Sequence, residues 1–298
     1  MKSIMTVSAL ILLGSATAAF AQLPLPTPTP PPVPITVPVS LTVAGNEAFG
    51  SFDIGGIGAD LKISFENVVG LVPSAFDVTA TLVDPVALLS RLPGSGVCVP
   101  PTAGAVCVPL DFPVVVRISP SAGSGLSFEG EYFVSFHTHN LHLDVNVPFS
   151  LFKSPNEGIF KDITKSEGRG SYRDDGGGGD FSDFLIAVDL RLIDDVILFK
   201  FGDLQSTITN AENAGSIPPD VAATLEADLT NARQLYQSGA IRDAIEAMRV
   251  FSRYVKANSG ENIPDVWRAN CSSLVNVAGL LRSGADTLRF SLDRKLSR

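Results

Sequence analysis

The 298-residue chain is acidic: 22 Lys and Arg face 31 Asp and Glu, which gives a formal net charge of −9 at pH 7. This charge argues against a nucleic-acid partner, because phosphate binding needs clustered Lys and Arg. Beyond the N-terminus no stretch reaches the roughly 18 unbroken apolar residues that predict a transmembrane helix. The length suits one large domain or two smaller ones.

The N-terminus has the pattern of a signal peptide. Lys2 precedes an apolar run from Val7 to Leu13, and small residues lead to a cleavage pattern that ends at Ala21. The apolar run is too short to span a membrane as a helix. We therefore predict a Sec signal peptide over residues 1–21 and an exported protein, periplasmic or secreted, without a transmembrane segment after cleavage.

A Pro-rich linker follows over residues 22–38, with the sequence QLPLPTPTPPPVPITVP. Such a run favours extended polyproline II and cannot build a core. We interpret it as a spacer before the first domain.

Residues 39–203 are predicted to form an antiparallel β-sandwich. Short alternating segments such as ADLKISFENVV, AFDVTATLV, SDFLIAVDLRLI and DVILFKF are separated by Gly, Pro and Asp. Alternation of this kind is typical of half-buried strands, and two packed sheets bury such faces most simply. This part carries 10 basic and 21 acidic side chains between residues 22 and 203, against 11 and 10 in residues 204–298. The change in charge predicts two domains.

Two of the three cysteines, Cys98 and Cys107, flank a short loop with two prolines and a glycine. In an exported protein we expect a disulfide to close this loop. The alternative is a reduced pair.

All three histidines lie in the segment FVSFHTHNLHLD, as His137, His139 and His142. If this segment is one strand, His137 and His139 share a face with Phe133 and Leu141, whereas His142 points the other way. The first two could bind a metal ion together with a carboxylate from a neighbouring strand. Because their face is largely apolar, we expect instead that they hydrogen-bond within the scaffold. No HExxH or GxSxG motif points to catalysis.

Four acidic residues surround a tetraglycine in SYRDDGGGGDFSDF, namely Asp174, Asp175, Asp180 and Asp183. Carboxylates on a loop suit Ca²⁺, so these four are candidate calcium ligands. The spacing fits neither the EF-hand nor the GGxGxD repeat, and a plain solvated loop is the expected structure.

Residues 204–298 are predicted to form a separate three-helix bundle. Apolar residues recur at helical spacing from Val221 to Tyr236 and from Ile241 to Val255, with Gly239 between the two runs. A third helix is expected from Pro264, with Trp267 and Cys271 on its buried side. The fold class is therefore α+β.

Two resemblances follow from these segments. The run ADLTNARQLYQSGAIRDAIEAMRVFSRYVKANSGENIP, residues 227–264, resembles the FIMAH-type helical hairpin of exported bacterial proteins, which implies attachment to extracellular polymers. More broadly, IGADLKISFENVVGL, PVVVRISP, HTHNL, FKDITKSEGRGSYR, FSDFLIAVDLR and IPDVWRANCSSLVNVAGLLR resemble an uncharacterised family of exported bacterial proteins. This second resemblance covers nearly the whole mature chain and brings no activity.

The sequence thus predicts an exported protein that binds partners and is not an enzyme. The expected partner is a cell-surface polymer or a protein, and no cofactor is expected. One alternative is a metal-binding protein or metal-dependent enzyme that uses His137, His139 and nearby carboxylates. A structural component of the cell envelope is another alternative.

Overall fold

The computed structural model of the protein describes residues 34–94, 103–121, 123–142, 147–168, 171–271 and 274–297. The expected signal peptide, most of the Pro-rich linker and Cys98 lie outside these residues. Residues 33–298 form one compact unit. No helix of the described segments has the length and apolar character that crossing a membrane requires.

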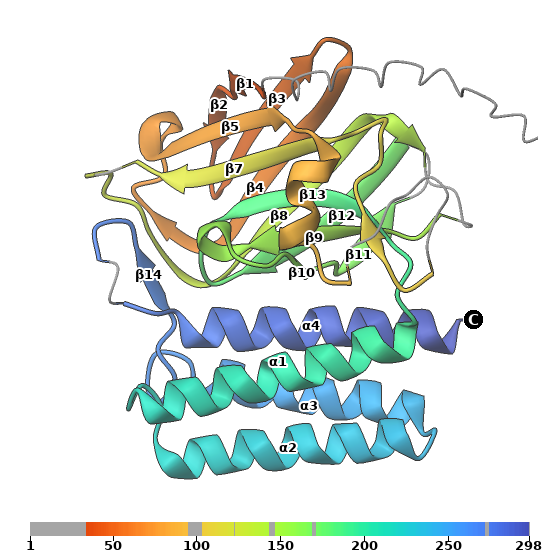
Figure 1. Cartoon of the computed structure of the whole chain (residues 1–298). Helices are drawn as coiled ribbons and strands as arrows, with labels where there is room; N and C mark the ends of the chain where they lie inside the picture. The colour runs from red at the N-terminus through yellow and green to blue at the C-terminus, as the bar shows by residue number, and fades with distance from the viewer. Residues whose placement is uncertain are drawn as a thin grey trace, which may run out of the picture. The chain divides into compact units, whose positions relative to one another are not determined.

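The strands form two antiparallel sheets (Figure 1). Sheet A has the order β1 (Ile35–Pro38), β5 (Phe76–Leu82), β7 (Val114–Pro120), β13 (Asp183–Asp189), β9 (Phe149–Ser154), β10 (Lys161–Asp162), and β6 (Val106–Cys107) pairs with β13. Sheet B has the order β11 (Ser166–Gly168), β12 (Ser171–Gly178), β8 (Ser127–His142), β4 (Ile57–Val69), β3 (Glu47–Ile54), β2 (Leu41–Ala44), and β14 (Val266–Arg268) pairs with β8.

The inner faces of the two sheets share one hydrophobic core. Strand β4 illustrates the cause, because Leu61, Ile63 and Phe65 alternate with polar residues and are all buried. An aromatic cluster extends this core, in which the ring of Phe65 lies 5.5 Å from Phe128 and 6.3 Å from Phe76 of sheet A. The alternation expected from the sequence is therefore confirmed for this strand.

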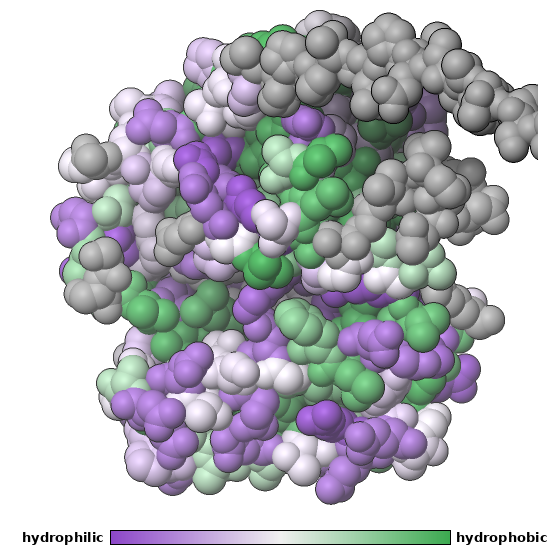
Figure 2. Space-filling model, in the orientation of Figure 1, coloured by the Kyte–Doolittle hydropathy of each residue, from purple (hydrophilic) through white to green (hydrophobic). Residues whose placement is uncertain are grey.

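The described residues form four α-helices: α1 (Ile193–Asn213), α2 (Pro219–Gln237), α3 (Ile241–Asn258) and, after β14, α4 (Val277–Leu296). Their apolar sides form a second core, with Phe201, Leu225, Phe251 and Leu288 fully buried in it. Figure 2 shows hydrophilic residues over much of the visible face of this helical layer. The layer thus buries its apolar stripes internally, as amphipathic helices do.

Three expectations about the helices are wrong. The segment Asp195–Phe201 was predicted as a strand but lies in α1, so the expected domain boundary at residue 203 falls inside a helix. Seven residues with many apolar side chains fit either the period of a strand or that of a helix. The contacts of the longer stretch that contains them, helix α1, favoured the helix. Within the residues that the structure describes, the bundle consequently has four helices where three were expected.

The last helix begins at Val277 and not at Pro264. Trp267 lies on β14, where its ring stacks 5.3 Å from that of Phe128 in the core of the sheets. Cys271 lies in the segment between β14 and α4 and is half-buried. The apolar residues that recur regularly from Trp267 onward therefore pack in two places. Trp267 packs in the core of the sheets, and the residues from Val277 onward pack in the core of the helices.

Helix α4 lies against sheet B, next to β8 and β12 (Figure 1). Its N-cap residue Asn276 accepts a hydrogen bond from Gly279 and donates one to the carbonyl of Gly130 on β8. A Cβ atom on Gly279 would lie 2.6 Å from the Gly130 oxygen, and one on Gly179 would lie 2.7 Å from the Asn276 oxygen. Glycine at these positions lets helix and sheet approach closely.

The tetraglycine after Asp175 was expected to be a solvated loop, and this expectation is wrong. Gly176, Gly177 and Gly178 belong to strand β12, and all three are buried. A Cβ on Gly177 would lie 2.7 Å from the Tyr132 oxygen, and one on Gly176 would lie 2.6 Å from the Ile163 side chain. Close packing on both faces of the strand explains the glycines better than flexibility does.

Candidate metal centre

The structure brings two of the three histidines together with a carboxylate. His137 and His139 lie on β8, and Asp60 lies on the neighbouring strand β4, where it is the direct cross-strand partner of His137. One ligand atom from each of the three residues lies within 4.8 Å of the others. We call Asp60, His137 and His139 the metal triad.

One carboxylate oxygen is central to the metal triad. Asp60 Oδ2 lies 3.2 Å from His137 Nδ1 and 3.3 Å from His139 Nε2. The two imidazole rings stand nearly perpendicular, with an interplanar angle of 79°. The three ligand atoms therefore converge on one small volume instead of pairing separately.

The metal triad faces solvent, which corrects the expectation of a largely apolar histidine face. The side chains of His137, His139 and Asp60 are 29%, 46% and 53% exposed. Their strand neighbours Phe136 and Thr138 point the other way and are buried. The histidines thus occupy the outer side of sheet B, where His137 forms its hydrogen bond with the side chain of Asp60 on the neighbouring strand.

The alternation of β8 shifts by one residue beyond His139. Leu141 is buried and His142 is exposed, although Leu141 was expected on the face of His137. The pairing of β8 with β12 changes register in the same region. A bulge of this kind re-aims the side chains that follow it. His142 is outside the metal triad.

The turn between β3 and β4 is held beside His139 by Asn140. The side chain of Asn140 accepts a hydrogen bond of 2.9 Å from the Gly58 amide and donates one of 2.7 Å to the Gly56 carbonyl. A Cβ atom on Gly58 would lie 3.0 Å from His139 Nδ1. Glycine at position 58 therefore leaves room for the imidazole.

The candidate calcium ligands do not form a site of their own. Asp174 is fully buried and accepts a 2.6 Å hydrogen bond from the Tyr172 hydroxyl. Asp175, the next residue on β12, accepts one of 2.5 Å from Ser166. Asp180 forms an ion pair with Lys153. Each carboxylate is thus occupied by a different protein partner.

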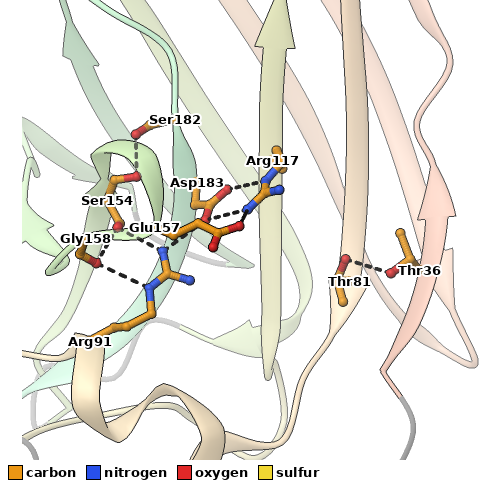
Figure 3. A network of polar contacts seen from close by, with 9 residues as sticks. All are labelled: Thr36, Thr81, Arg91, Arg117, Ser154, Glu157, Gly158, Ser182 and Asp183. Carbon is orange, nitrogen blue, oxygen red and sulfur yellow. Dashed lines mark hydrogen bonds and ion pairs between the residues drawn. The ribbon is translucent and has the colours of Figure 1, made fainter.

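Asp183 belongs to a separate network on sheet A (Figure 3). Arg117 donates hydrogen bonds of 2.7 and 3.2 Å to its carboxylate, and Arg91 donates one of 2.9 Å. Burial alone would raise the pKa of Asp183, but the two guanidinium groups outweigh it and the pKa is lowered. This carboxylate stabilises the joint between β7, β13 and the neighbouring loops.

A cavity between the sheets and the helices also holds charged residues. It is lined by three lysines and three aspartates, which pair as Lys153 with Asp180, Lys161 with Asp203 and Lys200 with Asp162. Because each ammonium group already has a carboxylate partner, the lining offers no uncompensated charge to a ligand. The metal triad is therefore the stronger candidate site.

Sequence reasoning missed Asp60 but named its type, a carboxylate from a neighbouring strand. The alternation of ADLKISF places Asp60 and Lys62 on the face opposite to the buried Leu61. That signal is present in the sequence, but it does not say that β4 pairs with β8.

The expected disulfide between Cys98 and Cys107 stays a prediction. Cys107 is buried on β6, and Cys98 lies outside the described residues.

Comparison with known protein families gives one result that spans the fold. Residues 9–295 match the model of a family described as a family of unknown function (DUF6689). The match covers both sheets and all four helices, in agreement with the resemblance expected over nearly the whole chain. No curated protein matches the chain. The chemistry of the metal triad must therefore be argued from its geometry.

Proposed function

Because the chain belongs to DUF6689, whose function is unknown, we propose its function from the geometry of sheet B: it binds a divalent transition-metal ion through Asp60, His137 and His139. The observation that carries this proposal is the convergence of their ligand atoms within 4.8 Å. Two imidazole nitrogens and one carboxylate oxygen are a ligand set that suits zinc, copper or nickel.

Two of the three distances between the ligand atoms match tetrahedral coordination, and the third, between the two imidazole nitrogens, is at most 4.8 Å. Atoms that each lie about 2.0 Å from a zinc ion at tetrahedral positions are about 3.3 Å from one another. Asp60 Oδ2 lies 3.2 and 3.3 Å from the nitrogens of His137 and His139. These distances support a shared ion, which would replace the hydrogen bond between His137 and Asp60.

The strands that carry the ligands support this proposal. β4 and β8 are inner strands of sheet B, each paired on both sides. Phe136 and Thr138, which flank His137 along β8, are buried in the core. A rigid frame reduces the ordering that ion binding requires. Three protein ligands leave at least one position of the ion open, where a further ligand from solution can bind.

Metal titration of the full exported chain, purified without a histidine tag and stripped with a chelator, tests the proposal. We expect binding of about one zinc or copper ion per chain, and a loss of affinity of at least about tenfold in Asp60→Asn, His137→Ala and His139→Ala. His142→Ala is the matched control, because this residue is exposed on the same strand but lies outside the metal triad.

Circular dichroism and thermal unfolding should give the same fold for all four variants, since these side chains lie outside the hydrophobic core. The proposal is wrong if the stripped wild-type chain binds neither ion at micromolar concentration. It is also wrong if the three triad variants bind as tightly as His142→Ala does.

Export and docking remain part of the proposed function. The signal peptide predicted from the sequence of residues 1–21 supports a periplasmic or secreted location. Helices α2 and α3 form a hairpin where the FIMAH resemblance was found, which supports docking to a surface polymer or a protein partner. In this proposal the protein is a β-sandwich with a helical docking layer, it binds without catalysing a reaction, and the ion adds a specific contact. Fractionation of cells that express the full chain tests the location.

A further inference from the structure

A row of four paired residues crosses the outer face of sheet B at the metal triad. Cross-strand pairing joins Ser51 on β3 to Asp60 on β4, Asp60 to His137 on β8, and His137 to Arg173 on β12. Directly paired residues of neighbouring antiparallel strands project from the same face. Arg173 therefore lies on the side of His137 that is opposite to Asp60.

Within the described part of the chain, no hydrogen bond or ion pair involves the guanidinium group of Arg173. The residue is exposed, whereas its neighbours Tyr172 and Asp174 are buried. Its aliphatic stem lies beside Gly168, where an added Cβ would come within 3.0 Å of the Arg173 Cβ. No carboxylate in the described part of the chain forms an ion pair with it, although most other arginines there have one.

A second cation flanks the metal triad on its other side. Lys62 follows Asp60 on the outer face of β4 and pairs with the half-exposed Glu47 at 2.7 Å. A shallow hollow between β2, β3, β4 and β8 includes Lys62, Phe49 and Ser135 and reaches Asp60 and His137. The open side of the metal triad is thus bordered by a hollow that a small molecule can enter.

The charges of the loaded site would be strongly positive. A divalent ion, one aspartate and Arg173 sum to a charge of about +2, and the ion pair of Lys62 with Glu47 adds no net charge. Such a site attracts anions, and a planar guanidinium donates two parallel hydrogen bonds to a phosphate or carboxylate group. The spacing of adjacent strands, about 4.8 Å, lets Arg173 reach a group that is bound to an ion above His137.

We infer that the ion held by Asp60, His137 and His139 binds an oxyanion at its open position, and that Arg173 donates hydrogen bonds to the other oxygens of that group. This inference rests on the proposed metal site and adds the class of its ligand: a small molecule with a phosphate or carboxylate end. The remainder of that molecule lies in the hollow beside Phe49.

Cobalt(II) provides a direct readout, because its visible absorption bands change when a ligand enters its coordination sphere. The full chain, loaded with cobalt and freed of excess metal, is titrated with inorganic phosphate and separately with acetate. We expect a saturable spectral change with at least one of them. The relative affinities of the two anions distinguish a phosphate ligand from a carboxylate ligand. The metal-free chain should show no heat of phosphate binding by calorimetry.

Arg173→Gln should weaken the affinity for the anion about tenfold and leave the affinity for cobalt unchanged. The anion affinity of Arg173→Lys should lie between those of the wild type and Arg173→Gln, because lysine keeps the charge without the planar guanidinium group. Arg268→Gln is the matched control, because Arg268 is exposed on β14 of the same sheet and outside the row.

The outcomes separate this inference from the proposed function. If cobalt binds through the metal triad but neither anion changes its spectrum, the inference fails and the metal site stands. If Arg173→Gln binds the anion as well as Arg268→Gln does, the inference also fails. If the chain binds no cobalt, zinc or copper, both are overturned.

Discussion

Glu66 on β4 and Arg282 on α4 form a bidentate ion pair in which Arg282 donates two hydrogen bonds of 2.6 Å, one to each carboxylate oxygen. This pair joins the sheets to the helical layer across most of the length of the chain. The guanidinium group holds the pKa of Glu66 below its usual value, and Lys256 on α3 contributes to the same shift. The contact therefore couples the two cores of the molecule.

Replacing the carboxylate with Glu66→Gln should destabilise the protein by about 1–2 kcal/mol at pH 7, because a partly buried Arg282 loses its charged partner. Since the pKa of Glu66 is lower in the folded state, its contribution is complete above the unfolded pKa and is lost as the pH falls through the folded pKa. In urea denaturation the difference between Glu66→Gln and wild type should therefore be larger at pH 7 than at pH 3.5. Arg249→Gln, which breaks an exposed pair on α3, is the control and should have no measurable effect.

Glycines should respond to substitution according to what surrounds them. Gly179→Ala should destabilise the protein by about 1–3 kcal/mol, because the new Cβ would lie 2.7 Å from the Asn276 oxygen at the start of α4. Gly202→Ala should stabilise it by about 0.5–1 kcal/mol, because Gly202 lies on α1 with nothing within 4 Å of an added Cβ. Chemical denaturation of both variants checks this pair, and equal effects would contradict the close approach of α4 to β12.

The buried Asp174 should make stability fall as the pH rises. Burial raises the pKa of Asp174 well above its usual value, the hydrogen bond from Tyr172 opposes this, and the charges of Glu167, Asp162 and Asp175 raise it further. An acid with a higher pKa in the folded state stabilises the fold fully below its unfolded pKa, and this contribution is lost as the pH rises toward the folded pKa.

Asp174→Asn removes that titration. The stability of the variant relative to wild type should therefore increase between pH 5 and pH 8 in urea denaturation experiments. A difference that is constant over this range would mean that the carboxyl group is ionised in the folded protein at both pH values.

Lys200 on α1 and Asp162 on β10 form a buried ion pair, and removing one of the two charges should destabilise the protein. Their charged atoms lie 2.8 Å apart, and both side chains are 6% exposed. Lys200 also donates hydrogen bonds to the Thr287 carbonyl and to Ser291 on α4. Lys200→Met should destabilise the protein by about 3 kcal/mol, because it leaves a buried carboxylate without a partner.

Adding Asp162→Asn to Lys200→Met should recover much of this loss, since the amide oxygen can still accept the hydrogen bond of the Thr164 amide. Comparing the single and double variants by thermal unfolding measures the coupling. Additive losses would show that the ion pair is not the source of the cost.

Part of this structure could be predicted from local periodicity. The alternation of Leu61, Ile63 and Phe65 indicated a half-buried strand, and the spacing from Val221 to Tyr236 indicated helix α2. Both followed because side chains on one face of an element recur with its period. The same reasoning failed at Asp195–Phe201 and at Trp267, where short apolar segments fit more than one element.

The candidate site, like the fold, could be predicted only in part from the sequence. The spacing of His137 and His139 was sufficient to place both imidazoles on one face of a strand. It also indicated that a metal site there would need a carboxylate from a neighbouring strand. The sequence does not contain the information that this face is solvent-exposed, that Asp60 is the carboxylate, or that Arg173 stands on the far side. Those facts depend on the pairing of β4, β8 and β12 and on which side of sheet B the other sheet covers. Pairing and coverage are set by contacts between distant segments, and a local pattern that is the same for either face cannot reveal them.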